Sequence, residues 1–186
     1  MNVKTHPGSR DRAFIARLEE LTGQQISRCY QCGNCTAGCP CSFAYDIPVH
    51  KIMRLLQSGR KDEVLSCRSV WLCASCNSCS VRCPNEIDVA GIMDVLRHMA
   101  RQEGHAPEHA VKAFADSFLA SVENNGRAFE MGILAGYAAR TGRVWTGMDL
   151  APKLLPKGKL SPLPHKVKNP GAIARIFERF REEYGK

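Results

Sequence analysis

The sequence lacks a long apolar run, a secretory signal and any nucleotide-binding loop. Its longest notable apolar stretch, Ala128–Ala139, is too short to span a bilayer and is interrupted by Glu130. The opening residues MNVKTHPGSRDR contain no apolar core, so we expect a soluble, cytoplasmic chain with no transmembrane segment. No G-x-G-x-x-G or G-x-x-x-x-G-K-[ST] loop, no C-C-G pair and no nucleophile beside a base occurs. The sequence therefore shows no place where a substrate would react.

Cysteine is absent from the last hundred or so residues, although the chain of 186 residues contains ten. All ten lie between Cys29 and Cys83. Disulfides are disfavoured in a reducing cytosol. A disulfide framework would also be expected to staple the whole chain rather than one third of it. Metal coordination is therefore the better interpretation of these cysteines.

Eight of the cysteines form two runs with the same spacing, C-x2-C-x2-C-x3-C-P. The first, Cys29–Pro40, reads CYQCGNCTAGCP, and the second, Cys73–Pro84, reads CASCNSCSVRCP. A zinc site usually takes two ligand pairs from separate places, whereas three crowded cysteines suit a loop that wraps a cubane. The runs predict two [4Fe–4S] clusters. The alternatives are a pair of zinc sites or a single cluster.

In bacterial runs of this spacing, the fourth cysteine ligates the other cluster. The same rule predicts that the two runs lie against each other and exchange their last ligands. Cys41 and Cys67 remain, and we expect both to be small buried hydrophobic residues, with a spare ligand or a redox thiol as the alternative. The predicted ligands are Cys29, Cys32, Cys35 and Cys83 for the first cluster, and Cys73, Cys76, Cys79 and Cys39 for the second.

Each cysteine run is followed by a segment with helical periodicity. DIPVHKIMRLL from Asp46 aligns with EIDVAGIMDVL from Glu86, so the chain contains an internal repeat of cysteine run plus helix. No segment reads convincingly as a strand, which predicts an all-α fold with pseudo-twofold symmetry. The apolar stripes are Val49, Ile52, Met53 and Leu56 in the first copy, and Val89, Ile92, Met93 and Leu96 in the second.

The two ends of the chain are expected to be helical and basic. A short N-terminal helix would begin at Ser9 and end at Gly23. After the second copy, an apolar stripe over Val111–Val122, the stretch AFEMGILAGYAART and a segment capped by Asn169 predict three more helices, with an irregular arm over Thr141–Asn169. From Ala151 onward nine Lys/Arg stand against three Glu. We predict three regions: an N-terminal helix (1–28), an α-helical dicluster ferredoxin domain (29–103) and a helical, basic C-terminal extension for subunit docking (104–186).

With these residues in view, the chain resembles the iron–sulfur C subunit of heterodisulfide reductase and its bacterial relatives. The resemblance rests on LEELTGQQISRCYQCGNCTAGCP, on WLCASCNSCSVRCPNEIDVAGIMDVLR and more loosely on FLASVENNGRAFEMGILAGY. It implies an α-helical ferredoxin core with two [4Fe–4S] clusters. It also implies partners: a flavin-containing subunit, and a C-C-G subunit where a disulfide is reduced. The eight cysteines named as ligands match those of the family one for one.

The function expected is therefore electron relay by a non-catalytic subunit of an oxidoreductase complex. Three alternatives stay open: a free dicluster ferredoxin, a cluster-based redox sensor or binding protein, and a relay to a membrane quinone-reactive partner. A nucleic-acid partner is not expected, because Glu178, Glu182 and Glu183 intersperse the basic residues of the tail. Peripheral membrane association stays open. A fumarate-reductase-like iron–sulfur subunit would need an upstream [2Fe–2S] domain, and the 28 residues before Cys29 contain no cysteine.

Overall fold

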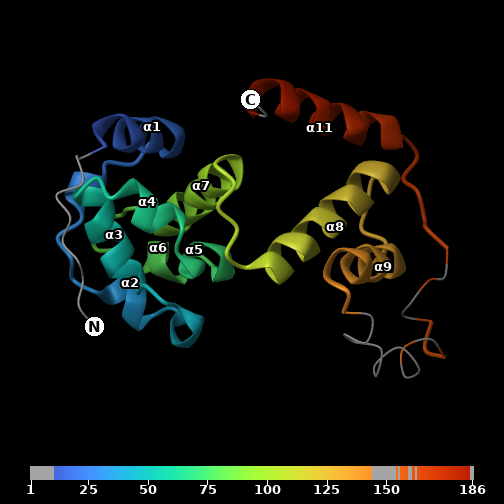
Figure 1. The fold of residues 1–186 in the computed structure, drawn as a ribbon, viewed down its shortest axis with the longest axis horizontal. Helices are drawn as coiled ribbons and strands as arrows, with labels where there is room; N and C mark the ends of the chain where they lie inside the picture. Colours follow the sequence, from blue (N-terminus) through green and yellow to red (C-terminus); the bar gives the residue numbers. More distant parts are fainter. Residues whose placement is uncertain (1–10, 144–153, 155, 159–160, 162, 185–186) are drawn as a thin grey trace. The chain divides into compact units, whose positions relative to one another are not determined.

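The computed structural model describes residues 11–143, 154, 156–158, 161 and 163–184. The chain forms two compact units, Met1–Pro107 and Glu108–Lys186. Every regular element in the described part of the chain is a helix, which confirms the all-α class (Figure 1). The first unit contains α1 (Arg12–Thr22), η1 (Ile26–Arg28), α2 (Asn34–Ala37), η2 (Ser42–Ala44), α3 (Val49–Gln57), α4 (Lys61–Leu65), α5 (Arg68–Leu72), α6 (Ser78–Val81) and α7 (Val89–Gln102).

The first helix, α1, begins at a different residue from the one expected. Asp11 is its N-cap, and Oδ1 of Asp11 accepts a hydrogen bond from the backbone N–H of Phe14 at 2.9 Å. A cap at Ser9 would lie outside the described residues, and the helix that is described begins only at Arg12. The C-terminal end is as predicted, because Gly23 adopts the left-handed conformation (φ 65°) that closes the helix. Helix α1 packs against α7, so it belongs to the first unit.

The internal repeat is present in the structure. Helix α6 begins 44 residues after α2, and α7 begins 40 residues after α3, the same offsets as in the sequence. The short helices α2 and α6 pack against each other. All eight residues of the two predicted apolar stripes are buried, which confirms that α3 and α7 face a common core: Val49, Ile52, Met53, Leu56, Val89, Ile92, Met93 and Leu96.

Gly38 and Arg82 occupy equivalent positions in the two copies and meet in space. A Cβ atom on Gly38 would lie 2.3 Å from Cδ of Arg82. The backbone of Gly38 has an ordinary φ of −96°, so glycine is favoured here by space rather than by conformation. The absence of a side chain at this position in one copy therefore leaves room for the Arg82 side chain of the other.

Asp46 ties the two copies together ahead of the second cysteine run. Its carboxylate accepts hydrogen bonds from the backbone N–H groups of Arg68 (2.9 Å) and Ser69 (3.0 Å), and from the Ser69 hydroxyl (2.6 Å). These N–H groups open α5, so Asp46 caps that helix from a distant part of the chain. Burial raises the pKa of Asp46, but these hydrogen bonds outweigh it and hold the pKa below the usual 3.8.

Replacing Asp46 with alanine should lower stability by about 1–2 kcal/mol, because it removes the cap of α5 and the acceptor for the Ser69 hydroxyl proton. The pKa of Asp46 is depressed on folding, so its contribution is complete above the usual pKa of 3.8 and is lost only as the pH falls through the folded value. The loss should therefore be constant between about pH 5 and pH 8.

This prediction is checked by thermal unfolding of the anaerobic protein, where a fall in Tm of a few degrees is expected. The exposed Asp62 on α4 provides the control, since Asp62→Ala should change stability by less than about 0.5 kcal/mol. An equal loss in both variants would show that Asp46 does not act as a cap.

The second unit contains α8 (His109–Asn125), α9 (Glu130–Thr141) and α11 (Pro170–Tyr184). Helices α8 and α9 form a hairpin, and α11 packs along α8 (Figure 1). Oδ1 of Asn169 accepts from the N–H of Ala172 at 3.2 Å, which confirms the predicted cap of the last helix. Arg181 of α11 donates to both carboxylate oxygens of Glu123 on α8. About half of the predicted irregular arm, including residues 144–153, lies outside the described residues.

The face of α8 that packs inside this unit is not its apolar stripe. The buried residues of α8 are Ala113, Ser117 and Ser121, whereas Phe114 and Phe118 remain 52% and 40% exposed. Small side chains let the two helices of the hairpin approach closely. The expected stripe over Val111–Val122 therefore predicted the helix correctly but not the face that it buries.

Candidate functional site

The two cysteine runs adopt matching loops. Gln31 and Ser75, each the second residue after the first cysteine of its run, have positive φ values of 65° and 49°. Gly33 and Asn77, two residues further on, also match, at 83° and 61°. Left-handed backbone outside glycine costs energy and persists where the surroundings require it, often at functional sites. The two copies therefore agree in backbone shape as well as in spacing.

A hydroxyl group ties each run to the helix that follows it. Thr36 Oγ1 accepts from the N–H of His50 at 3.0 Å, at the start of α3. Ser80 Oγ accepts from the N–H of Ala90 at 2.9 Å, at the start of α7. Thr36 and Ser80 each directly follow the third cysteine of a run. The position of the third cysteine is thus coupled to a buried helix in both copies.

The second run lines a small cavity. Cys73, Cys76 and Cys79 contribute to its wall, as the spacing predicts. Cys39, the last cysteine of the first run, lines the same cavity, whereas Cys83 does not. The phenol of Tyr45 interacts with both Cys39 and Cys73, and partial burial followed by these two thiols raises the pKa of Tyr45. The structure thus brings together the four residues predicted for the second cluster.

The cysteines of the first run lie near Tyr30 and Cys83. Desolvation raises the pKa of Tyr30, and so do the nearby thiols of Cys32, to which the phenol hydrogen-bonds, Cys83 and Cys29. Burial, opposed by hydrogen bonds from Thr36 and aided by Cys29 and Cys32, raises the pKa of Cys35. The structure therefore places all four residues predicted for the first cluster in one neighbourhood.

Hydrogen bonds between the copies explain why Cys83 reaches the first run. Asn85 donates from its amide to the carbonyl of Arg28, the residue before Cys29. The side-chain oxygen of Gln24 accepts from the backbone N–H of Asp88 at 3.0 Å. The segment that follows the second run is thus fixed against the segment that precedes the first.

The two remaining cysteines have different surroundings. Cys67 is 3% exposed, and burial raises its pKa to about 11, which confirms the expectation of a buried, unreactive residue. Cys41 is half-buried and lines the second cavity beside Cys39. The expected burial of Cys41 is therefore only partial.

The chemistry of the cavity of the second run suits an iron–sulfur cluster. Five cysteines line it, and none of the described residues that line it is a histidine or an acidic residue. All ten cysteines are free thiols, so the ligands are not consumed in disulfides. Among the described residues, no three histidine, cysteine or acidic side chains converge closely enough to share a single metal ion. The remaining lining residues include Val49, Ala90 and Met93, which shield the cavity from water.

Comparison with known proteins agrees with this site. Residues 18–88 match the family model of the 4Fe-4S dicluster domain. This match and the eight cysteines of the two runs define a helical ferredoxin domain with two [4Fe–4S] clusters. The prediction of two clusters is thereby confirmed.

Curated proteins that resemble the chain carry more specific names. The C subunit of the H(2):CoB-CoM heterodisulfide,ferredoxin reductase of Methanothermobacter thermautotrophicus is 34% identical over 109 residues, which cover 58% of this chain and 59% of the relative. A protein of Archaeoglobus profundus that is named as similar to the C subunit of heterodisulfide reductase is 30% identical over 124 residues, covering 66% of this chain and 62% of the relative. The chain is thus similar to C subunits of heterodisulfide reductases, and its match spans about 60% of these relatives' length.

In the part of the chain that the structure describes, no helix is both long enough and apolar enough to cross a membrane.

Proposed function

We propose that this chain is the electron-relay subunit of a heterodisulfide-reductase-like complex. Its clusters would pass electrons one at a time between a flavin-containing subunit and a C-C-G subunit that acts on a disulfide or thiol. The observation that carries this proposal is the cavity of the second run, into which the first run contributes Cys39. With this exchange the eight cysteines would hold both clusters within the first unit: Cys29, Cys32, Cys35 and Cys83 for one, and Cys73, Cys76, Cys79 and Cys39 for the other.

The protein supplies the positions and surroundings of the clusters rather than a reacting group. The helices α3 and α7 bury Val49 and Met93 on one side of the cavity of the second run, which shields that side from water. The exposed thiols of Cys32 and Cys76 would face solvent or a partner and provide routes for electrons to enter and leave. This arrangement favours a carrier over a site that transforms a substrate.

The second unit supports docking into a larger assembly. It lies outside residues 18–88, which match the dicluster domain. It presents half-exposed aromatic rings, including Phe114 and Phe118. Apolar surface of this kind is typical of a protein–protein contact. We place the complex in the cytoplasm, where thiols stay reduced.

The proposal is tested by purifying the tagged full chain anaerobically from its native host and identifying the proteins that accompany it by mass spectrometry. A flavoprotein and a protein with C-C-G motifs are expected, with about eight irons per chain. Recovery of the chain alone with the same iron content would contradict the relay and favour a free ferredoxin.

A further inference from the structure

A side chain at the end of α3 holds the first cysteine run by its backbone. The amide nitrogen Nε2 of Gln57 donates to the carbonyl oxygen of Cys29 at 2.6 Å and to that of Ile26 at 3.3 Å. The two carbonyls belong to the turn that leads into the run. Gln57 therefore fixes the backbone of the first ligand of that run.

An equivalent side chain on α7 holds the second run in the same way. Arg97 donates from Nη2 to the carbonyl oxygen of Cys73 at 2.5 Å and from Nε to that of Val70 at 3.0 Å. Arg97 lies 40 residues after Gln57, the offset of the two helices, and the two acceptors of Arg97 lie 44 residues after those of Gln57, the offset of the runs. Both copies thus use the same pair of hydrogen bonds. In one copy the donor is a neutral amide, and in the other it is a cation.

This difference in charge has a consequence for electron transfer. Reduction adds a negative charge to a cluster, so a nearby cation stabilises the reduced form and raises the reduction potential. Arg97 carries a guanidinium cation and its side chain is only 29% exposed, so water screens its charge incompletely. Its hydrogen bond ends on the carbonyl of a predicted ligand residue, Cys73.

Building on the proposed function, we propose that Arg97 raises the potential of the second cluster above that of the first. An electron would then leave the first cluster and come to rest on the second, which is reduced as the first is oxidised. The repeat supplies two similar sites, and the exchange of Gln57 for Arg97 makes them unequal. This difference favours electron flow from the first cluster to the second.

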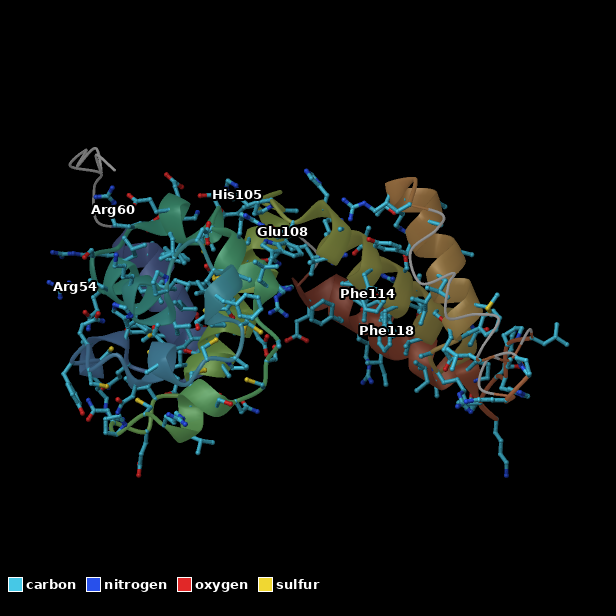
Figure 2. All side chains as sticks on the ribbon, turned by 90° about the horizontal axis from the view of Figure 1, so that it is seen from below. Arg54, Arg60, His105, Glu108, Phe114 and Phe118 are labelled. Carbon is cyan, nitrogen blue, oxygen red and sulfur yellow. The ribbon has the colours of Figure 1, made fainter. Side chains whose placement is uncertain are left out.

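Two further charges oppose the effect of Arg97 on the difference between the two potentials. Oδ1 of Asp94 lies 3.5 Å from Nη1 of Arg97 and accepts from the Ser75 hydroxyl at 2.6 Å. In the first copy the equivalent residue is Arg54, which donates to the side-chain oxygen of Gln57 at 3.4 Å. The Asp94 side chain is 50% exposed and Arg54 lies at the surface of α3, so solvent and salt weaken both (Figure 2). Arg97 is the least screened of the three charges.

The test is an anaerobic redox titration of the full chain with both clusters, followed by electron paramagnetic resonance. Arg97→Gln gives the second site the neutral donor of the first. The reduction equilibrium of one cluster should become about tenfold less favourable, which lowers its potential by about 59 mV for one electron. Gln57→Arg should raise the potential of the other cluster. Arg97→Lys keeps the charge and should retain most of the original value, whereas a residue that only held the backbone would show equal effects in both Arg97 variants.

Three results would overturn the inference: unchanged potentials in Arg97→Gln, a shift in the cluster of lower potential, or a shift of the same cluster by Arg97→Gln and Gln57→Arg. If Arg97→Gln fails to retain its clusters, Asp94→Asn decides the question, since it removes the opposing charge and should raise the potential of the second cluster. These potentials are properties of the isolated chain. The predicted difference in potential can therefore prove wrong while the purified complex still forms. Equally, the difference can be found while no complex is recovered.

Discussion

Replacing Cys39 with serine is expected to remove the cluster of the second run and to leave the cluster of the first. Cys39 belongs to the first run by sequence but lines the cavity of Cys73, Cys76 and Cys79. Serine is a much poorer ligand for iron than a thiolate. Iron content should fall from about eight to about four per chain, measured together with acid-labile sulfide after anaerobic purification.

Double variants identify which cluster is lost. If Cys39 shares a cluster with Cys76, the variant Cys39→Ser/Cys76→Ser should retain about four irons, the same as the single variant. The variant Cys39→Ser/Cys32→Ser should lose both clusters. The reverse pattern would show that each run holds its own cluster and would refute the exchange of ligands. Additivity of this kind is informative because residues that share one site act as a unit.

Cys41 has to be controlled in this experiment, since it lines the same cavity. Its thiol could replace that of Cys39 in the single variant. Cys41→Ser alone should keep about eight irons. Cys39→Ser/Cys41→Ser should keep about four, even if Cys41 lets the Cys39→Ser variant keep more. Loss of iron in Cys41→Ser alone would make Cys41, rather than Cys39, the fourth ligand.

Replacing both exposed rings of α8, as Phe114→Ser/Phe118→Ser, should abolish complex formation while both clusters remain. The two ring centroids lie 6.4 Å apart, and the side chains are 52% and 40% exposed (Figure 2). Phe114 also meets Tyr137 of α9 edge-on, at 6.5 Å between centroids. Buried aromatic contacts of this kind often contribute about 2 kcal/mol or more to binding, which is roughly 30-fold in affinity for each ring.

The measurement is the yield of partner proteins in an anaerobic pull-down of the tagged variant, with iron content and thermal unfolding determined in parallel. Leu163, an apolar residue that is 72% exposed and lies outside the described helices, provides the control. Leu163→Ser should leave the complex intact. If the double variant still recovers its partners in normal yield, the face of α8 is not the docking surface.

Local sequence was sufficient for the helical class, the two clusters and the repeat. A cysteine run occupies only twelve residues, so its spacing alone specifies a cluster loop. The stripes on α3 and α7 were readable for the same reason, since the period of a helix is local. The matching offsets of the runs and helices also indicated a pair of similar sites.

Other features depended on tertiary contacts. The N-cap of α1 proved to be Asp11, because capping depends on where the helix begins to bury Phe14 and Leu18. Helix α8 buries its small residues instead of its phenylalanines, because close approach of α9 favours serine and alanine at the contact. A periodic pattern shows that a helix has two faces but not which face its neighbour will cover.

The arrangement around the clusters needed the structure most. The exchange of fourth ligands stays a prediction, yet the nearness of Cys39 to the second run became visible only when the two copies were folded together. The hydrogen bonds of Gln57 and Arg97 reach back about 30 residues and about 25 residues along the chain, and no local rule predicts them. Sequence by itself determined which atoms can bind iron. The tertiary structure decided which charges lie beside them, because a field depends on distance in space rather than on separation along the chain.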